Sequence, residues 1–317
     1  MNFIVLQIQK EKNQILINSK PAFLNDGVLT SEYGSITFYN EQTVPYHLNE
    51  GQHIAKVGTF VDTDIETCKG IYKADSVTIY EIKEINRKET IEWMTENGIN
   101  LKNNCSYYLR AAVDAGYHCL IQYLIESGAD INNADGYPLR KAAGKGLYES
   151  VRLLVESGAD IHMNNEAAFQ AAVLNGHLEI VKYLVGKGAD IHVYDDYALR
   201  TASAKGYIEI VRFLIIKGAN IHVYNDNALS AAALNGHFDI VKLLVRYGAD
   251  IHASNDDALL YAEKYNHNDI AEYLKHIAKK KQLFRLERLL SNWTAFLKDR
   301  KKKEEYEEQK ICKWFNI

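Results

Sequence analysis

The sequence predicts an α-solenoid built from a repeated 30-residue unit, with a small β-rich or α+β domain before it and an amphipathic helix after it. Only three of the 317 residues are prolines, and 47 % hydrophobic with 25 % charged residues is a globular composition. The string Gly-Ala-Asp-Ile begins at Gly128, Gly158, Gly188 and Gly248, and Gly-Ala-Asn-Ile at Gly218, so one copy falls every 30 residues. Repetition at such a period is the signature of stacked units.

The leading residues, 1–82, are expected to form a separate domain, because short β-prone runs alternate there with clusters of Gly, Asn and Asp. These runs are Phe3–Ile8, Gln14–Asn18, Ser35–Tyr39, Ile54–Phe60, Gly70–Lys73 and Val77–Ile82. Residues 83–278 then hold a degenerate half-repeat and six full units. We expect a helix between Arg87 and Gly98 to begin the stack, since a repeat array needs a cap at its end.

Each unit is expected to consist of two short antiparallel helices. The first is rich in alanine, as at Ala198–Lys205, and the second carries a broad apolar stripe, as at Leu178–Lys187. A glycine such as Gly206 stands between them, where the turn needs a positive φ; the last unit has Asn266 there. Asx clusters such as Asp195-Asp196 precede the first helix and are expected to accept hydrogen bonds from its first-turn amides.

The trailing residues, 279–317, are expected to form a helix with one apolar stripe and a charged tail. The stripe consists of Leu283, Phe284, Leu286, Leu289, Leu290, Trp293, Phe296 and Leu297. We expect it to cap the open face of the last unit; the alternative is a helix for a partner or for self-association. The tail from Lys298 to Lys310 is expected to be a solvated, fraying helix.

The repeated frame closely resembles the ankyrin repeat. The resemblance is carried by Phe169 to His192, including Gly176-His177-Leu178-Glu179-Ile180-Val181 and Gly188-Ala189-Asp190-Ile191. It implies a curved solenoid used for protein–protein recognition. The chain departs from the family in three respects. The Thr-Pro pair is missing, with only Pro138 retained, and Arg110, Arg140 and Arg200 stand in place of histidine. The period is also short, which shortens the loops between repeats, here called fingers, such as the loop between Ile191 and Leu199.

A looser resemblance rests on the short period and on the amino-acid sequence of the repeats, such as Asn235-Gly236-His237-Phe238-Asp239-Ile240-Val241-Lys242. In these respects the chain looks like the short-period ankyrin proteins of giant DNA viruses (mimivirus-like). That resemblance implies an adaptor that acts on host proteins.

No motif for catalysis, a cofactor or a metal is found in the sequence. His162, His192, His222 and His252 recur every 30 residues. Packed layers lie about 10 Å apart, so one metal ion cannot bind histidines of two successive repeats. We expect these histidines to form hydrogen bonds along the loops instead. No enzyme activity, cofactor or metal is expected. The alternative is an enzyme with its active site in residues 1–82, where His47, His53, Asp62, Asp64 and Asp75 are the candidate ligands.

The charge distribution narrows the class of partner. Residues 275–317 hold 13 basic and 6 acidic side chains, which leaves 24 basic and 35 acidic ones in the acidic remainder. Nucleic-acid binding by the body is therefore not expected. The four cysteines are scattered and no signal peptide or membrane span is found, so we expect an intracellular monomer that does not bind membranes.

The candidate site is a surface on the first helices and the fingers. It consists of Arg140, Lys141, Lys145, Asn175, Arg200, Lys205 and Asn235, with Tyr194 and Tyr224 at the fingers. Tyrosine and arginine are frequent interface anchors, and the basic residues stand out on an otherwise acidic body. The expected ligand is therefore a protein partner, in particular an acidic or phosphorylated segment.

Overall fold

The computed structural model describes nine strands between Asn2 and Glu84 and a continuous path from Ile85 to Phe315. The structure does not describe residues 1, 10–13, 18–19, 26–27, 32–35, 41–52, 60–65, 69–70, 75, 316 and 317. Side chains are described at 54–55, 83–283 and 286–303. The chain divides into two compact parts, Met1–Tyr194 and Asp195–Ile317, and each is described by itself.

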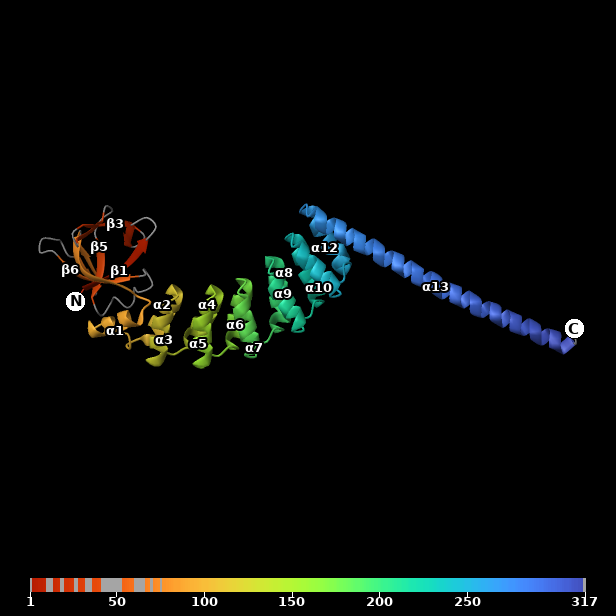
Figure 1. Cartoon of the computed structure of the whole chain (residues 1–317), viewed down its shortest axis with the longest axis horizontal. Coiled ribbons are helices and arrows are strands. Elements are labelled where there is room, and N and C mark those ends of the chain that lie inside the picture. Colours follow the sequence, from red (N-terminus) through yellow and green to blue (C-terminus); the bar gives the residue numbers. More distant parts are fainter. Residues whose placement is uncertain are drawn as a thin grey trace. The chain divides into compact units, whose positions relative to one another are not determined.

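The first part begins with antiparallel strands, as the alternating β-prone runs predict (Figure 1). They are β1 Asn2–Gln9, β2 Gln14–Ile17, β3 Lys20–Asn25, β4 Val28–Ser31, β5 Ile36–Asn40, β6 His53–Thr59, β7 Glu66–Cys68, β8 Ile71–Ala74 and β9 Ser76–Glu84. The strand order is β2-β3-β4-β9-β6-β1-β5-β8-β7, and β1 also pairs with β2, which closes six strands into a ring. In the register of β1 and β6, Ile4 faces Ala55.

Six of the described strands fall on the runs expected from sequence, whereas β3, β4 and β7 were not among them. The unexpected strands are short or carry Pro21, which cannot donate a hydrogen bond to a neighbouring strand and so reads as a strand breaker. Pro21 nevertheless stands opposite Leu16 of β2 in the sheet. Pairing with neighbouring strands therefore decides these segments against their local signal.

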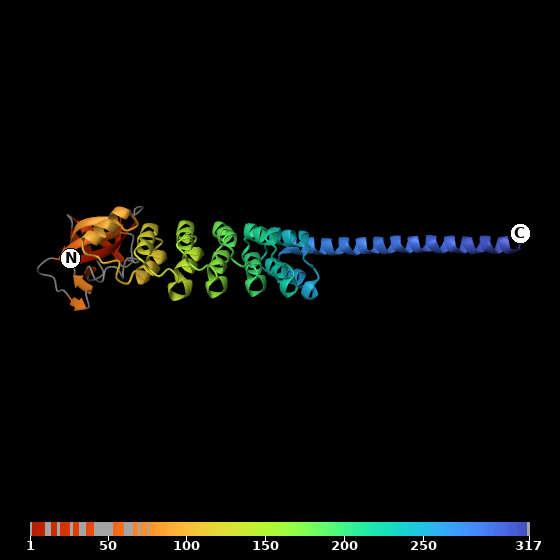
Figure 2. The ribbon, with the colours of Figure 1, turned by 90° about the horizontal axis from the view of Figure 1, so that it is seen from below.

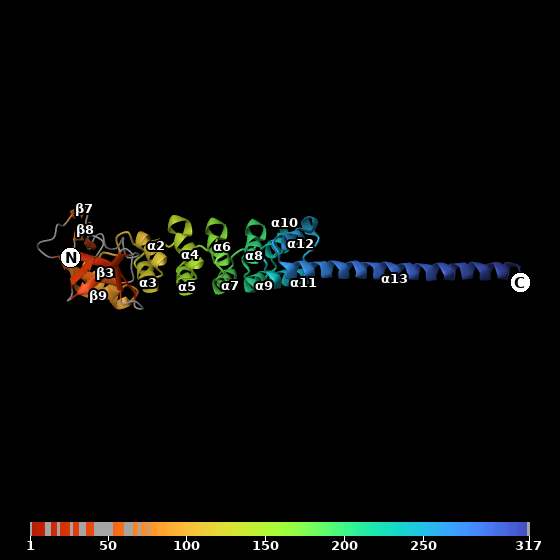
Figure 3. The same cartoon turned by 90° about the horizontal axis from the view of Figure 1, so that it is seen from above.

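From residue 88 onward the chain is helical, and each repeat contributes two helices (Figure 2). The first part contains α1 Lys88–Glu96, α2 Cys105–Ala115, α3 His118–Glu126, α4 Asn133–Lys145, α5 Tyr148–Glu156, α6 Met163–Leu174 and α7 Leu178–Gly186. The following helices are α8 Val193–Lys205, which contains the boundary, α9 Ile208–Ile216, α10 Val223–Leu234, α11 Phe238–Arg246, α12 Ala253–Lys264 and α13 Asn268–Phe315. Within each part, even-numbered first helices form one row and odd-numbered second helices another (Figure 3).

The core of the repeats lies where the two sequence patterns placed it. In the second helix α7, Ile180, Val181 and Leu184 are buried, and in the preceding first helix Phe169 and Ala172 are buried. Alanines let first helices approach closely, while the branched side chains of the second helices cover them. The expected helix before the stack is α1, which buries Ile91 and Met94 and packs beside α3. The repeats therefore form the α-solenoid that the sequence predicts.

The glycine between the helices of a repeat is required twice over. Gly206 has φ of +83°, and a β-carbon added to it would lie 2.7 Å from Cε1 of His237. The ring of His237 is held there because its Nε2 donates to the carbonyl oxygen of Ala204 at 3.0 Å. Asn266 of the last repeat has φ of +61°, as expected for the residue that substitutes glycine best.

The Asx clusters have a different role from the one expected. Tyr224, Asn225 and Asp226 all have positive φ, between 49° and 56°, so the first residues of α10 make a left-handed turn ahead of its regular helical part. The Oδ1 atom of Asp226 accepts from the backbone amide of Asp250 at 3.2 Å, in the next repeat. Asn and Asp are common here because they tolerate the left-handed conformation, and the carboxylate connects repeats instead of capping its own helix.

The apolar stripe expected to cap the last repeat does not do so in the structure. The helix α13 runs without a break from Asn268 to Phe315 and extends beyond α12 (Figure 1). Described stripe residues such as Leu286, Leu290 and Trp293 are 50–62 % exposed. The sequence from 268 to 315 contains no glycine or proline, so nothing turns the helix back onto the repeat.

The domain boundaries expected from the sequence, at residues 82 and 278, remain predictions.

A search of the described residues finds no helix whose length and hydrophobicity would let it cross a membrane.

Candidate partner-binding surface

The first part carries a group of charged and aromatic residues between α2 and α4, which we call the Tyr137 cluster. It consists of Arg110, Asp114, Tyr137, Arg140, Lys141 and Lys145. The hydroxyl of Tyr137 donates to both carboxylate oxygens of Asp114, at 2.8 and 2.9 Å. Burial, and then the hydrogen bond to Asp114, raises the pKa of Tyr137. The Tyr137 hydroxyl therefore stays protonated, and its ring is an uncharged aromatic surface for the neighbouring arginines.

Four cations surround this tyrosine–carboxylate pair. The guanidinium carbons of Arg110 and Arg140 lie 4.8 and 5.9 Å from the centre of the Tyr137 ring. The ammonium of Lys141 is 3.6 Å from Oδ1 of Asp114, and that of Lys145 donates to the Asp114 carbonyl oxygen. One carboxylate cannot balance four cations. Arg140 and Lys145 are exposed, so excess positive charge faces the solvent.

The second part carries a related group, the Arg200 cluster, which consists of Asp195, Tyr197, Arg200 and Tyr224. The guanidinium carbon of Arg200 lies 4.7 Å from the ring centre of Tyr224 and 5.5 Å from that of Tyr197. The Tyr224 hydroxyl donates to Oδ2 of Asp195 at 2.8 Å, and this hydrogen bond raises the pKa of Tyr224. Tyr224 remains 59 % exposed, so an arginine and an accessible ring stand together.

The fingertip tyrosines reach back to the preceding finger. The hydroxyl of Tyr194 accepts from Nδ2 of Asn165 at 2.8 Å, in the first part, just as Tyr224 bonds to Asp195 in the second. Tyr194 is also 59 % exposed. These contacts orient the two tyrosines while leaving more than half of each residue exposed to the solvent.

The remaining predicted residues are not brought into either cluster by the contacts found. The Nδ2 atoms of Asn175 and Asn235 donate to the carbonyl oxygens of Ala171 and Ala231, at 2.9 and 2.8 Å, at the ends of their own helices. Both therefore serve as helix C-caps, and Lys205 is an exposed residue at the end of α8. Whether these positions bind a partner remains a prediction.

Arg110, Asp114 and Tyr137 were missing from the predicted site. The repeat offered a signal for Arg110, which occupies the same position as Arg140 and Arg200 one or more periods away. Tyr137 had the same kind of signal, because Tyr107 and Tyr197 occupy its position in other repeats, whereas aspartate does not recur at the position of Asp114. Their pairing depends on the distance between α2 and α4, which the sequence does not state.

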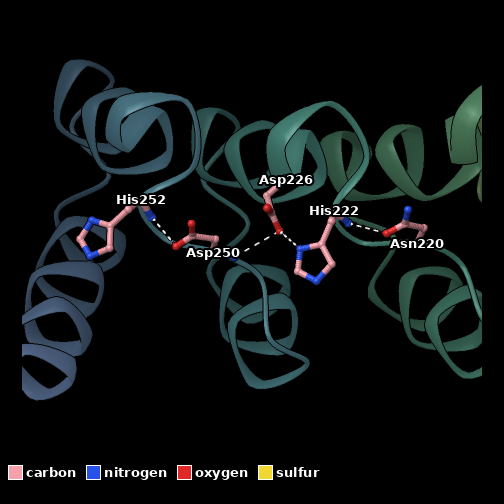
Figure 4. A network of polar contacts seen from close by, with 5 residues as sticks. All are labelled: Asn220, His222, Asp226, Asp250 and His252. Atoms are coloured by element: carbon pink, nitrogen blue, oxygen red, sulfur yellow. Dashed lines mark hydrogen bonds and ion pairs between the residues drawn. The ribbon is translucent and has the colours of Figure 1, made fainter. Parts of the chain in front are cut away.

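The periodic histidines form a ladder through the loops, shown for the second part in Figure 4. Nδ1 of His222 donates to Oδ1 of Asp226 at 3.0 Å, and Asp226 accepts from the amide of Asp250. The Oδ1 atom of Asp250 in turn accepts from the amide of His252 at 3.0 Å. The His162–Glu166 pair in the first part has the same arrangement, at 2.6 Å. These histidines bind carboxylates within their loops.

The described residues contain no group of three or more His, Cys, Asp or Glu side chains placed to hold a metal ion. Of the candidate ligands for an enzyme site in the leading domain, His47, Asp62, Asp64 and Asp75 lie outside the described residues. His53 is the first residue of β6, and only its backbone is described. The alternative of an enzyme in this domain therefore remains a hypothesis.

A family model described as ankyrin repeats (3 copies) matches residues 79–165, 109–195 and 198–283, which together make up more than half of the chain. No curated protein matches the chain.

Proposed function

The chain belongs to the ankyrin-repeat family, and we propose that it is a non-enzymatic scaffold that holds a protein partner on its first helices and fingers. Repeats of this family are generally protein–protein interaction modules. The observation that carries the proposal is the stacking of arginine on tyrosine in both the Tyr137 and the Arg200 clusters, with Arg140 exposed in the first and Tyr224 exposed in the second. Such side chains lose little conformational freedom on binding, because stacking already orders them.

The proposed ligand is an acidic or phosphorylated segment of a protein. The Tyr137 cluster has three more cations than carboxylates, and its Arg140 and Lys145 are exposed. Guanidinium groups bind carboxylate and phosphate with two parallel hydrogen bonds, which makes arginine better suited than lysine to this task. A negative segment would also be steered towards the clusters on an otherwise acidic chain. Each cluster is proposed to bind its own short stretch of ligand.

The finer proposal is an adaptor that acts on host-cell proteins for a giant virus. This proposal is supported by the 30-residue period, the absence of Thr-Pro pairs and the amino-acid sequences of the repeats. An adaptor needs a second contact besides the repeats, and both the leading strands and α13 are available for one.

The test is a reversal of charge in the full chain. The variant Arg140→Glu, Lys145→Glu, Arg200→Glu, Lys205→Glu is compared with Lys182→Glu, Lys187→Glu, Arg212→Glu, Lys217→Glu, in which four exposed cations of the second-helix side change by the same amount. Partners captured from a cell extract are identified by mass spectrometry. We expect the first variant to lose the main partner and the second to retain it, with unchanged circular dichroism in both.

A matched pair of synthetic peptides then separates the two kinds of ligand. The segment of the captured partner is prepared with and without phosphate, and binding is measured by calorimetry. A phosphate-dependent gain of about tenfold or more would assign phosphorylated ligands to the clusters. Equal capture of the partner by both charge variants would move the binding site away from the first helices and overturn the proposal.

A further inference from the structure

A hollow of about 630 Å³, which we call the terminal hollow, lies at the open end of the last repeat, beside α12 and α13. Its apolar lining includes Ile251, Leu259 and Leu274. Leu259 is half-buried, whereas Leu229, at the same position one repeat earlier, is 1 % exposed because the next repeat covers it. The terminal hollow is therefore the place that a following repeat would occupy.

Two substitutions explain why the chain does not fill this place itself. An internal repeat is followed by a turn glycine and a buried isoleucine, which are Gly248 and Ile251 after the fifth repeat. Thirty residues later stand Ala278 and Lys281, both inside the continuous helix α13. Without the glycine the helix does not end, and a lysine does not replace a buried isoleucine.

The terminal hollow also contains a carboxylate whose counterparts bind the following repeat. Asp226 accepts from the backbone amide of Asp250, 24 residues later, at 3.2 Å (Figure 4), and the same contact occurs one repeat earlier. The residue 24 positions after Asp256 is Lys280, whose amide belongs to α13 and not to a finger. The carboxylate of Asp256 accepts from His252, and a carboxylate has room for further donors. An occupant with a free backbone amide would therefore complete the site.

The rim of the terminal hollow is positively charged. Lys275, Lys279 and Lys281 line it and are exposed, whereas Asp256 is the one carboxylate in its lining. Lys275 pairs with Glu263 at 2.7 Å, which leaves the charges of Lys279 and Lys281 in excess. This rim attracts an acidic occupant. It disfavours a second copy docked through the same hollow, because the same lysines would then face each other.

We propose that the terminal hollow binds a short acidic segment of a partner protein, which takes the place of the finger of a following repeat. A leucine or isoleucine of the segment packs against Leu259 and Leu274, and one of its backbone amides donates to Asp256. Its carboxylates pair with Lys279 and Lys281. The terminal hollow shares no residue with the Tyr137 or the Arg200 cluster, so it provides a second contact of the kind that an adaptor needs.

The test uses a fluorescent peptide with the sequence of residues 247–262, the segment that covers the fifth repeat in the folded chain. The peptide has three aspartates and no lysine or arginine, and it includes the isoleucine of the finger. Its binding to the full chain is measured by fluorescence anisotropy. The variant Lys279→Glu, Lys281→Glu reverses two rim charges, and Lys280→Glu, Arg288→Glu reverses two exposed charges of the same helix outside the lining. Circular dichroism checks that both variants keep the helix.

We expect the unaltered chain and the Lys280, Arg288 variant to bind the peptide equally well. The rim variant should bind it at least about tenfold more weakly. Peptides with serine in place of the isoleucine, or with asparagine in place of the three aspartates, should lose affinity for the unaltered chain by a similar factor.

A dissociation constant above about 1 mM for the unaltered chain would overturn the proposal. Equal binding by the rim variant and its control would also overturn it, because the peptide would then bind elsewhere. A dimer of the unaltered chain that the rim substitutions dissociate, seen by sedimentation equilibrium, would assign the terminal hollow to a second copy instead. None of these outcomes depends on the charge-reversal test of the first helices.

Discussion

The fifth and sixth repeats carry the same histidine–aspartate pair, and the two carboxylates lie in different surroundings. The side chain of Asp226 is 6 % exposed and accepts hydrogen bonds from His222 and from the amide of Asp250 in the next repeat. The side chain of Asp256 is 47 % exposed and pairs with His252 at 2.6 Å. The motif is the same in both repeats. A following repeat is what buries the carboxylate and supplies its second donor.

The apolar core shows the same difference. Leu229 of α10 is 1 % exposed, whereas Leu259, at the same position of α12, is half-buried and lines the hollow beside α13. Each repeat can bury only part of its surface by itself, and the rest is buried by its neighbours. Stability in such an array is therefore a property of adjacent pairs, and it falls towards a free end.

The largest expected effect comes from truncating this leucine in each repeat. Leu229→Ala leaves a cavity in a fully packed site and should lower the free energy of unfolding by about 2–5 kcal/mol. Leu259→Ala removes a side chain that already borders a hollow, so its loss should be markedly smaller. Urea unfolding of the full chain, followed by circular dichroism, measures both. Equal losses of unfolding free energy in the two variants would contradict the inference that a terminal repeat is packed less tightly than an internal one.

A smaller effect is expected from removing the two carboxylates. Asp226→Ala removes a buried carboxylate that accepts hydrogen bonds from the Asp250 amide and from His222, and should cost about 1–3 kcal/mol. Asp256→Ala removes a largely exposed ion pair, and such pairs contribute at most about 1 kcal/mol. Hydrogen exchange of the Asp250 amide gives a local reading, because that amide should lose protection in Asp226→Ala. Retained protection would show that Asp226 is not its essential acceptor.

The periodic features were predictable from sequence because repetition marks them. The apolar stripe Ile180, Val181 and Leu184 and the positive φ of Gly206 each have counterparts in other repeats, so every copy supports the same assignment. The carboxylate at Asp226 was recognised as a loop residue but given the wrong partner. Its partner lies 24 residues away in the next repeat, and local rules for helix caps consider only the residue's own helix.

The features that occur once were harder to predict. The Tyr137–Asp114 pair depends on an aspartate that no other repeat has at this position, and on how closely α2 and α4 approach. The stripe of α13 was found from the sequence, but the prediction that it caps the last repeat was wrong, because an apolar stripe does not by itself identify the surface that covers it. The missing helix breaker in 268–315 was the signal that could have decided this.

The smallest expected effect concerns pH and tests the ladder in the third repeat, where glutamate replaces aspartate. His162 donates from Nδ1 to Oε1 of Glu166 at 2.6 Å; the histidine side chain is 59 % exposed and the glutamate 4 %. This hydrogen bond, followed by the attraction of the carboxylate, raises the pKa of His162 above its ordinary 6.5. The folded chain thus binds the proton more tightly than the unfolded chain does.

The sign of the pH dependence follows from this raised pKa. The stabilisation is fully present below about pH 6.5, the ordinary pKa of histidine, and is lost as the pH rises through the pKa of the folded state. Nuclear magnetic resonance titration of the His162 ring measures that pKa directly. The variant His162→Asn is the reference: it lacks the resonance of His162, and it lacks the contribution of His162 to the thermal midpoint. Solvent screens an exposed imidazole, so the midpoint should fall only slightly more with rising pH in the unaltered chain than in the variant. A measured pKa at or below 6.5 would mean that the buried carboxylate of Glu166 does not hold the histidine in solution. The ladder would then be confined to the repeats that carry aspartate.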